Sequence, residues 1–203
     1  MSRFILGIAF VAMLLGPSPG PAEIASFDEA SGEMVMGDKE APITIIEYSS
    51  LTCSHCASFH RETLPKIKES YIDTGKAKLV YRDYPFGAMA LAAAMVARCA
   101  GPAKYFGMIE ILFRGQDKWT RSQNPLVEIK RVARFGGISA ADVDACLDNE
   151  PLMKSIQQGK AAAIKEFNVK STPTFFIGGN RVEGAQPFGE FEAAIEKALK
   201  ETN

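Results

Sequence analysis

Hydrophobic and polar positions repeat with two different periods along the chain, and these periods divide it into regions. Residues 43–48 (ITIIEY) are almost all β-branched or aromatic, which predicts a strand covered on both faces. A helical period follows from Cys53, and residues 78–85 predict the next strand. A strand, a helix and a strand within about 40 residues form a βαβ unit, so we expect the two strands to be parallel.

The first predicted helix carries its own breaks. Phe59, Ile67 and Tyr71 fall on one side of it, as the core-facing residues of an amphipathic helix do. Pro65 lies in its interior and predicts a kink, because proline lacks the N–H that continues the helical hydrogen bonding. Gly75 predicts its end.

The middle of the chain has a helical pattern, and its last quarter returns to strands. Residues 89–99 are alanine-rich, and apolar residues recur at spacings of three and four in 103–113 and 126–135. Ser139 predicts the start of a helix at 140–147, and Pro151 predicts the start of a long helix at 151–167. Short strands at 174–177 and 181–183 flank a Gly-Gly-Asn turn, and an amphipathic helix follows at 188–200. With a short strand at 34–36, the pattern predicts an α/β fold in the order βαβ, helical block, ββα.

The N-terminus reads as a secretory signal peptide of residues 1–22. Residues 4–15 are an apolar run, shorter than the roughly 20 residues needed to cross a bilayer. Gly20 and Ala22 then offer small residues at the −3 and −1 positions of a cleavage site. An uncleaved anchor or a buried N-terminal helix is the alternative. Cleavage predicts an exported protein.

The charge balance gives no sign of an anionic partner. The chain has 23 Lys and Arg against 24 Asp and Glu, a formal net charge of −1. Loss of Arg3 with the leader leaves 22 against 24, a net charge of −2. Neither nucleic acid nor an anionic membrane surface is indicated as a partner.

Residues 51–60 (LTCSHCASFH) hold two of the four cysteines and both histidines. Covalent haem attachment needs C-x-x-C-H, and Ala57 follows Cys56, so that interpretation fails. Cys53, Cys56 and His60 could face one side of a helix and bind metal, but structural zinc takes four ligands. A metal-binding chaperone using these three residues therefore stays open as an alternative.

Two disulfides are expected from an even cysteine count in an exported chain. By loop-closure entropy a Cys53–Cys56 bond is worth about 2 kcal/mol, whereas a Cys99–Cys146 bond closes a loop of about 48 residues and is worth about 4 kcal/mol. The second pair therefore suits a structural disulfide and the first does not. Two buried free thiols are the alternative for Cys99 and Cys146.

The position of Cys53 favours redox chemistry. It lies where the first strand of the βαβ unit turns into its helix, so its sulfur faces unpaired N–H groups and the positive end of the helix dipole. His55 adds a donor and at times a charge. Both favour the thiolate and lower the pKa of Cys53, while Cys56, one turn further on, is the resolving thiol.

These features together resemble one family. The chain resembles the DsbA family of thioredoxin-fold thiol oxidases in four features. They are the sequence CSHC directly after a strand, a kinked helix, a helical insertion, and Thr172-Pro173 before the last hairpin. The resemblance covers residues 33–200. It implies a thioredoxin-like fold with an N-terminal segment (23–41), a thioredoxin-like domain (42–87 and 168–203) and an all-helical insertion (88–167).

The resemblance also implies site residues. It implies a cis bond between Thr172 and Pro173, with the backbone of Thr172 receiving the substrate. It implies that Glu47 is a buried acid that relays a proton for Cys56, although a strand-end glutamate reaching solvent fits the composition equally. His60 is given no role and is expected to lie on a helix surface or to be a satisfied histidine.

The sequence therefore predicts a monomeric, periplasmic oxidase that donates the Cys53–Cys56 disulfide to reduced exported polypeptides. No cofactor is expected, and the resemblance implies reoxidation by a membrane quinone-linked partner of the DsbB type. Ser54 and Thr172 depart from the pattern of strongly oxidising relatives, which leaves an isomerase or reductase open. A non-catalytic binder of exported polypeptides is an alternative from another class.

Overall fold

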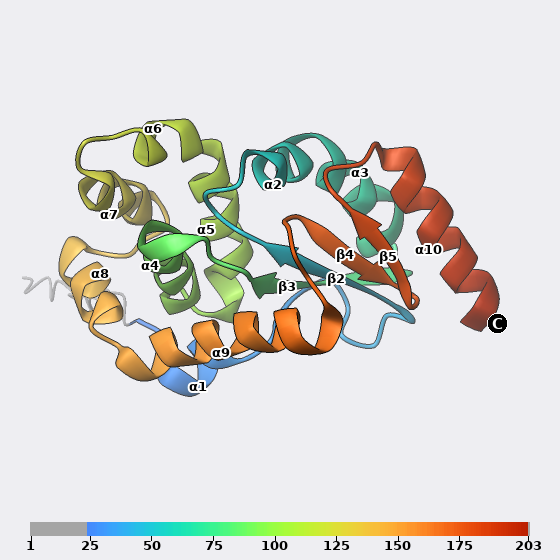
Figure 1. The fold of residues 1–203 in the computed structure, drawn as a ribbon, viewed down its shortest axis with the longest axis horizontal. Coiled ribbons are helices and arrows are strands. Elements are labelled where there is room, and N and C mark those ends of the chain that lie inside the picture. The colour runs from blue at the N-terminus through green and yellow to red at the C-terminus, as the bar shows by residue number, and fades with distance from the viewer. Residues whose placement is uncertain (1–23, 203) are drawn as a thin grey trace, which may run out of the picture.

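A computed structural model describes residues 24–202, in which five strands form one mixed sheet (Figure 1). The strands are β1 (Met34–Met36), β2 (Ile43–Ser49), β3 (Ala77–Asp83), β4 (Thr174–Ile177) and β5 (Asn180–Glu183). Their order is β1-β3-β2-β4-β5. β2 and β3 are parallel, as predicted, and the other neighbouring pairs are antiparallel. The predicted leader lies outside the described residues.

Helices cover the sheet and extend beyond one end of it. They are α1 (Phe27–Ser31), α2 (Ser54–Ser58), α3 (Leu64–Ile67), α4 (Gly87–Cys99), α5 (Pro102–Arg114), α6 (Gln116–Thr120), α7 (Pro125–Phe135), α8 (Ala140–Leu147), α9 (Glu150–Phe167) and α10 (Phe188–Thr202). Figure 1 shows α4 to α8 gathered beyond the end of the sheet where β2 leads into α2. None of the helices in residues 24–202 has the length and apolar character that a membrane crossing needs.

The two faces of the sheet bury different side chains. On one face, Ile45 and Phe175 pack against Phe191 of α10 and against Phe59, which lies in the helical run that begins with α2 (hereafter the active-site helix). On the other face, Tyr48 packs in a smaller cluster with residues of α9 and the segment after it. The central strands are therefore covered on both sides, as the apolar pattern of residues 43–48 predicts.

The helical run after Cys53 changes its hydrogen bonding on both sides of α3. The π-helical turns η1 (Phe59–Thr63) and η2 (Lys68–Ile72) flank it. The N–H of Leu64 bonds to the carbonyl of Phe59, five residues back. Pro65, which has no N–H to give, thus follows a widened turn, and the interruption expected at this proline takes the form of a π-helical segment.

Two short helices are not predicted by the sequence. α1 and α6 have five residues each, too few for a periodic pattern. α1 begins with a capping box between Ser26 and Glu29. α6 buries Gln116 and Trp119, whose side chains bond to backbone carbonyls outside this helix. Both helices thus depend on side-chain contacts that a short sequence window does not reveal.

A disulfide joins the end of α4 to α8. The Cα atoms of Cys99 and Cys146 are 6.2 Å apart, and both cysteines are buried among apolar residues. The bond spans 47 positions of the chain, most of the helical region.

Replacing both Cys99 and Cys146 by alanine is expected to lower the free energy of unfolding by about 2–4 kcal/mol, because the unfolded chain regains the entropy of the open loop. Urea denaturation measures this. Both proteins should also carry Cys53→Ala and Cys56→Ala, so that the redox state of the other pair contributes nothing. Equal unfolding midpoints would contradict a stabilising cross-link.

Candidate active site

The pairing of β2 with β4 brings two distant segments to the same edge of the sheet. Tyr48 of β2 lies opposite Thr174 of β4, so the end of β2 adjoins the start of β4. Cys53 follows β2 and is the N-cap of α2. Its Sγ donates a hydrogen bond to the carbonyl oxygen of Thr172 at 3.3 Å, and the Thr172–Pro173 peptide bond is cis.

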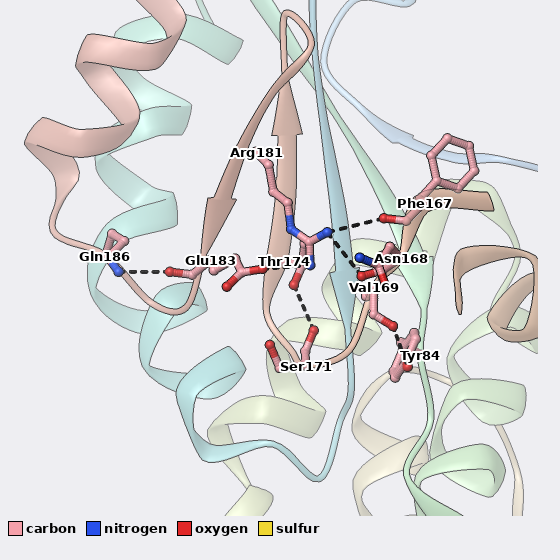
Figure 2. Close-up of polar contacts among 9 residues, drawn as sticks. All are labelled: Tyr84, Phe167, Asn168, Val169, Ser171, Thr174, Arg181, Glu183 and Gln186. Carbon is pink, nitrogen blue, oxygen red and sulfur yellow. Dashed lines mark hydrogen bonds and ion pairs between the residues drawn. The ribbon is translucent and has the colours of Figure 1, made fainter. Parts of the chain in front are cut away.

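The loop that carries Thr172 is held by side chains from the surrounding strands (Figure 2). These side chains donate to backbone carbonyls: Tyr84 to Val169 (3.0 Å), Arg181 to Phe167 (3.3 Å) and Asn168 (3.1 Å), and Thr174 to Ser171 (2.8 Å). Because each bond fixes a carbonyl of the loop or of the helix end before it, the backbone beside Cys53 has a defined position.

The surroundings of Cys53 lower the pKa of its thiol to about 5. The hydrogen bond from the Cys56 thiol is the largest cause, and partial burial opposes it. The Thr172 side chain also lowers the pKa of Cys53. Its buried hydroxyl has no other hydrogen-bond partner in residues 24–202, so it can donate to the Cys53 thiolate. Backbone N–H groups of Cys56 and His55 add to the effect, as expected at a helix start.

The environment of Cys56 has the opposite effect. Cys56 is fully buried, and desolvation raises the pKa of its thiol well above the ordinary value. The hydrogen bond with Cys53 and the charge of Glu47 raise this pKa further. Neighbouring thiols with such different acidities are suited to thiol–disulfide exchange, in which one sulfur is a thiolate and the other stays protonated.

Glu47 and His60 form a buried pair, and the charge of its carboxylate acts on Cys56. Glu47 lies between Tyr81 of β3 and Phe175 of β4 in the register of the sheet. Both of its carboxylate oxygens are 3.1 Å from Nε2 of His60, and the side chains are 0% and 5% exposed. Glu47 is therefore a buried acid, and His60 is a satisfied histidine away from the helix surface.

His55 and Gln116 contribute in ways that the motif does not indicate. The His55 side chain is exposed, and it is its backbone N–H that acts on the Cys53 sulfur. Gln116, buried in α6, donates to the carbonyls of Leu51 (2.8 Å) and Cys53 (2.9 Å). It thereby holds the turn before the active-site helix. No motif marks this glutamine, because its role comes from a contact across more than 60 positions of the chain.

The three residues of the metal alternative are not gathered into a ligand set. Within residues 24–202, no group of three or more His, Cys, Asp or Glu side chains is placed to hold a metal ion. His60 contacts Glu47 through Nε2. The free thiols of Cys53 and Cys56 are hydrogen-bonded to each other, and Cys53 also donates to the carbonyl of Thr172. The geometry therefore favours a dithiol site.

Comparisons with known proteins agree with this geometry. The family profile described as thioredoxin matches residues 29–197. The crystal structure of alpha-DsbA1 from Wolbachia pipientis has a TM-score of 0.78 and 31% identity, covering 93% of this chain and 96% of that one. A protein from Rickettsia bellii named as a protein-disulfide oxidoreductase is 30% identical over 178 residues, and the match covers 87% of this chain and 68% of that protein.

A third relative is more distant. Disulfide bond formation protein D of Bacillus subtilis is 24% identical over 174 residues, covering 83% of this chain and 78% of that protein. This chain thus spans about two thirds of the Rickettsia bellii relative and more of the Bacillus one.

The acidity of Cys53 gives a direct test of the site. In the reduced protein, thiolate absorbance at 240 nm is expected to titrate near pH 5. Cys56→Ala removes the principal donor and should raise the pKa of Cys53, whereas Cys56→Ser keeps an O–H donor and should raise it less. A titration near the free cysteine pKa of about 8.5 in the parent protein would contradict the arrangement.

The stability of the reduced protein should follow the same titration. A depressed pKa means that the thiolate stabilises the fold above about pH 8.5, the value of a free thiol. This stabilisation is lost as the pH falls through the folded value of about 5. Relative to Cys53→Ser, the reduced protein should therefore become less stable between these limits, as measured by urea denaturation.

Proposed function

This chain belongs to the DsbA family of thioredoxin-like protein-disulfide oxidoreductases, and we propose that it donates the Cys53–Cys56 disulfide to reduced polypeptides outside the cytoplasm. The observation that carries the proposal is the opposite displacement of the two thiol pKa values. A stabilised thiolate favours the reduced dithiol, and a protein whose reduced form is favoured gives its disulfide away.

The magnitude of this effect depends on the acidity of Cys53. Each pKa unit by which a thiol is made more acidic stabilises the dithiol by about 1.4 kcal/mol, or about 30 mV for a two-electron couple. The surroundings of Cys53 lower its pKa to about 5. The raised pKa of Cys56 does not offset this near neutral pH, because Cys56 is then protonated in the dithiol.

The exchange proceeds in two displacements. A substrate thiolate attacks Cys53 Sγ, forming a mixed disulfide and breaking the bond to Cys56, whose sulfur leaves with the electron pair and takes up a proton. A second substrate thiolate attacks the substrate sulfur of the mixed disulfide and expels the Cys53 thiolate. The substrate is oxidised by two electrons, and the protein is left as a dithiol. The low pKa of Cys53 makes it a good leaving group in this last displacement.

The parts of the fold have separate roles in the proposal. The thioredoxin-like domain (42–87 and 168–203) carries both cysteines and the cis peptide, where the backbone of Thr172 receives the extended substrate chain. The helical insertion (88–167) supports the site, as the Gln116 bonds to the turn before α2 suggest. The segment 23–41 precedes these parts, and the protein acts as a periplasmic monomer after removal of residues 1–22.

Reoxidation needs a partner. The dithiol passes its two electrons to a membrane quinone-linked protein of the DsbB type, and the protein itself uses no cofactor. Ser54 stands where strongly oxidising relatives often have proline, and a threonine before the cis-proline, as at Thr172, is common among the isomerases and reductases of the family. The direction of electron flow is therefore tested through the reduction potential.

The reduction potential of the Cys53–Cys56 pair tests the direction. Equilibration in glutathione buffers is expected to give a value well above the roughly −270 mV of thioredoxin and nearer the roughly −120 mV of DsbA. Cys53→Ala should abolish oxidation of a reduced dithiol peptide and spare peptide binding. A potential close to that of thioredoxin would refute the oxidase and indicate a reductase.

The proposed proton relay through Glu47 has its own test. The glutamine in Glu47→Gln cannot exchange a proton with Cys56, so the Cys53–Cys56 disulfide of this variant should react more slowly with thiols. The rate should fall by up to about 10²–10⁴-fold, which is the contribution of general acid–base catalysis. Quenched-flow alkylation of the cysteines measures the rate. Glu190→Gln, which removes an exposed carboxylate of α10, is the matched control. Equal rates in the parent and Glu47→Gln would discard the relay.

A further inference from the structure

The burial of Glu47 raises the question of how a proton reaches it. Glu47 and Cys56 are both 0% exposed, so neither exchanges protons with bulk water through its own surface. If Glu47 protonates the departing Cys56 thiolate, as proposed above, a further group must return a proton to the carboxylate before the next turnover.

His60 is placed to be that group. Its Nε2 lies 3.1 Å from each carboxylate oxygen of Glu47, so both hydrogen-bond contacts are made by one ring nitrogen. The imidazole ring packs against the ring of Phe113, with 4.4 Å between the ring centroids. It also makes T-shaped contacts with Phe59 and Tyr81. These contacts fix the orientation of the imidazole and leave the Nδ1 side of the ring pointing away from the carboxylate.

A cavity connects His60 to the surface. It has a volume of about 560 Å³ and lies between the active-site helix and α5, with Leu64 and Phe106 among its apolar lining residues. Its rim includes the exposed residues Arg61, Lys68 and Glu110. A cavity of this size with exposed walls admits water, so the imidazole joins a buried carboxylate on one side to solvent on the other.

We propose that His60 is a positioning residue that orients Glu47 and carries protons between this cavity and the Cys56 thiolate. The inference rests on thiol–disulfide exchange at Cys53–Cys56 and deepens the proposed role of Glu47. An imidazole can take up and release a proton, so His60 is suited to exchange one with the Glu47 carboxylate that it contacts.

The proton balance of the step is simple. Attack of a thiolate on Cys53 releases Cys56 as a thiolate, and the pair gives it one proton, which passes through the Glu47 carboxyl group. The pair is left as carboxylate and neutral imidazole. Water in the cavity then returns one proton to His60. Reoxidation runs these transfers in reverse, and Cys56 gives its proton to the pair.

Charged and titratable groups from each neighbouring element surround the pair. They are Tyr81 from β3, Cys56 from α2, Arg61 and Lys68 from the helical run after Cys53, and Glu110, Arg114 and Tyr105 from α5. Arg114 pairs with Glu110, and Lys68 pairs with Asp73. Arg61 lines the cavity without an ion pair to another described residue, which makes it a matched control for charge near the cavity.

The test uses His60→Gln and Arg61→Gln in the full chain. Glutamine keeps an N–H donor for Glu47 but cannot carry a proton. The rate of disulfide reduction by dithiothreitol, expressed per thiolate, is expected to fall by about 10- to 100-fold in His60→Gln, at or below the lower end of general acid catalysis. The pH profile of this rate should also differ from that of the parent, because glutamine has no exchangeable ring proton. Arg61→Gln should keep the rate and the pH profile.

A second variant separates proton transfer from packing. In His60→Ala, added imidazole should restore the rate through the cavity, whereas pyrazole, which has the same shape but is far less basic, should not. The Cys53 pKa, followed at 240 nm, should stay near 5 in both His60 variants. Equal rescue by the two compounds, or a His60→Gln rate and pH profile like the parent, would overturn the relay and leave His60 as a packing residue.

The choice of dithiothreitol keeps this test separate from the proposed direction of flux. Any C-x-x-C protein of this fold reacts with a small dithiol, whether it works as an oxidase or as a reductase. A low reduction potential would therefore refute the oxidase and leave the His60 results interpretable. If His60→Gln reacts with dithiothreitol as fast as the parent and the parent oxidises peptides, the relay is overturned and the oxidase proposal stands.

Discussion

The antiparallel pairing of β2 with β4 holds the sulfur of Cys53 within 3.3 Å of the Thr172 carbonyl oxygen. The two residues are 119 positions apart, and the whole helical region lies between them in the chain. Because the end of β2 adjoins the start of β4, the turn that carries Cys53 lies beside the loop that carries the cis peptide. Packed clusters cover both faces of the sheet next to this contact.

A second constraint is the difference in solvation between the two cysteines. Cys53 lies at the first turn of the helix, where backbone N–H groups and the Cys56 thiol stabilise negative charge. Cys56 is fully buried, and desolvation keeps its thiol protonated. The same helix thus presents one sulfur to substrate and withholds the other, and any proton that reaches the second has to pass through buried groups. Two such groups are Glu47, whose charge acts on Cys56, and His60, which contacts Glu47.

The helical region takes part in the site as well as covering it. Gln116 of α6 bonds to two carbonyls of the turn before α2, and Phe113 of α5 packs on the His60 ring. The disulfide between Cys99 and Cys146 ties α4 to α8. Changes far from the cysteines can therefore alter the acidity of Cys53 or the solvent access of His60 by moving these helices, even though the sheet is untouched.

The order of the strands and of the longer helices, the parallel β2–β3 unit and the position of Cys53 at a helix start could be predicted from the sequence, because each is encoded in apolar periodicity or in the spacing of nearby residues. Tertiary structure decided the rest of the site. The burial of Glu47, its contact with His60 and the bonds of Gln116 depend on which side chains face each other once strands and helices pack. Periodicity marks the buried face of an element, but it does not name the partner across that face. His60 illustrates the difference, since the sequence assigns it no role and packing places it against the buried carboxylate.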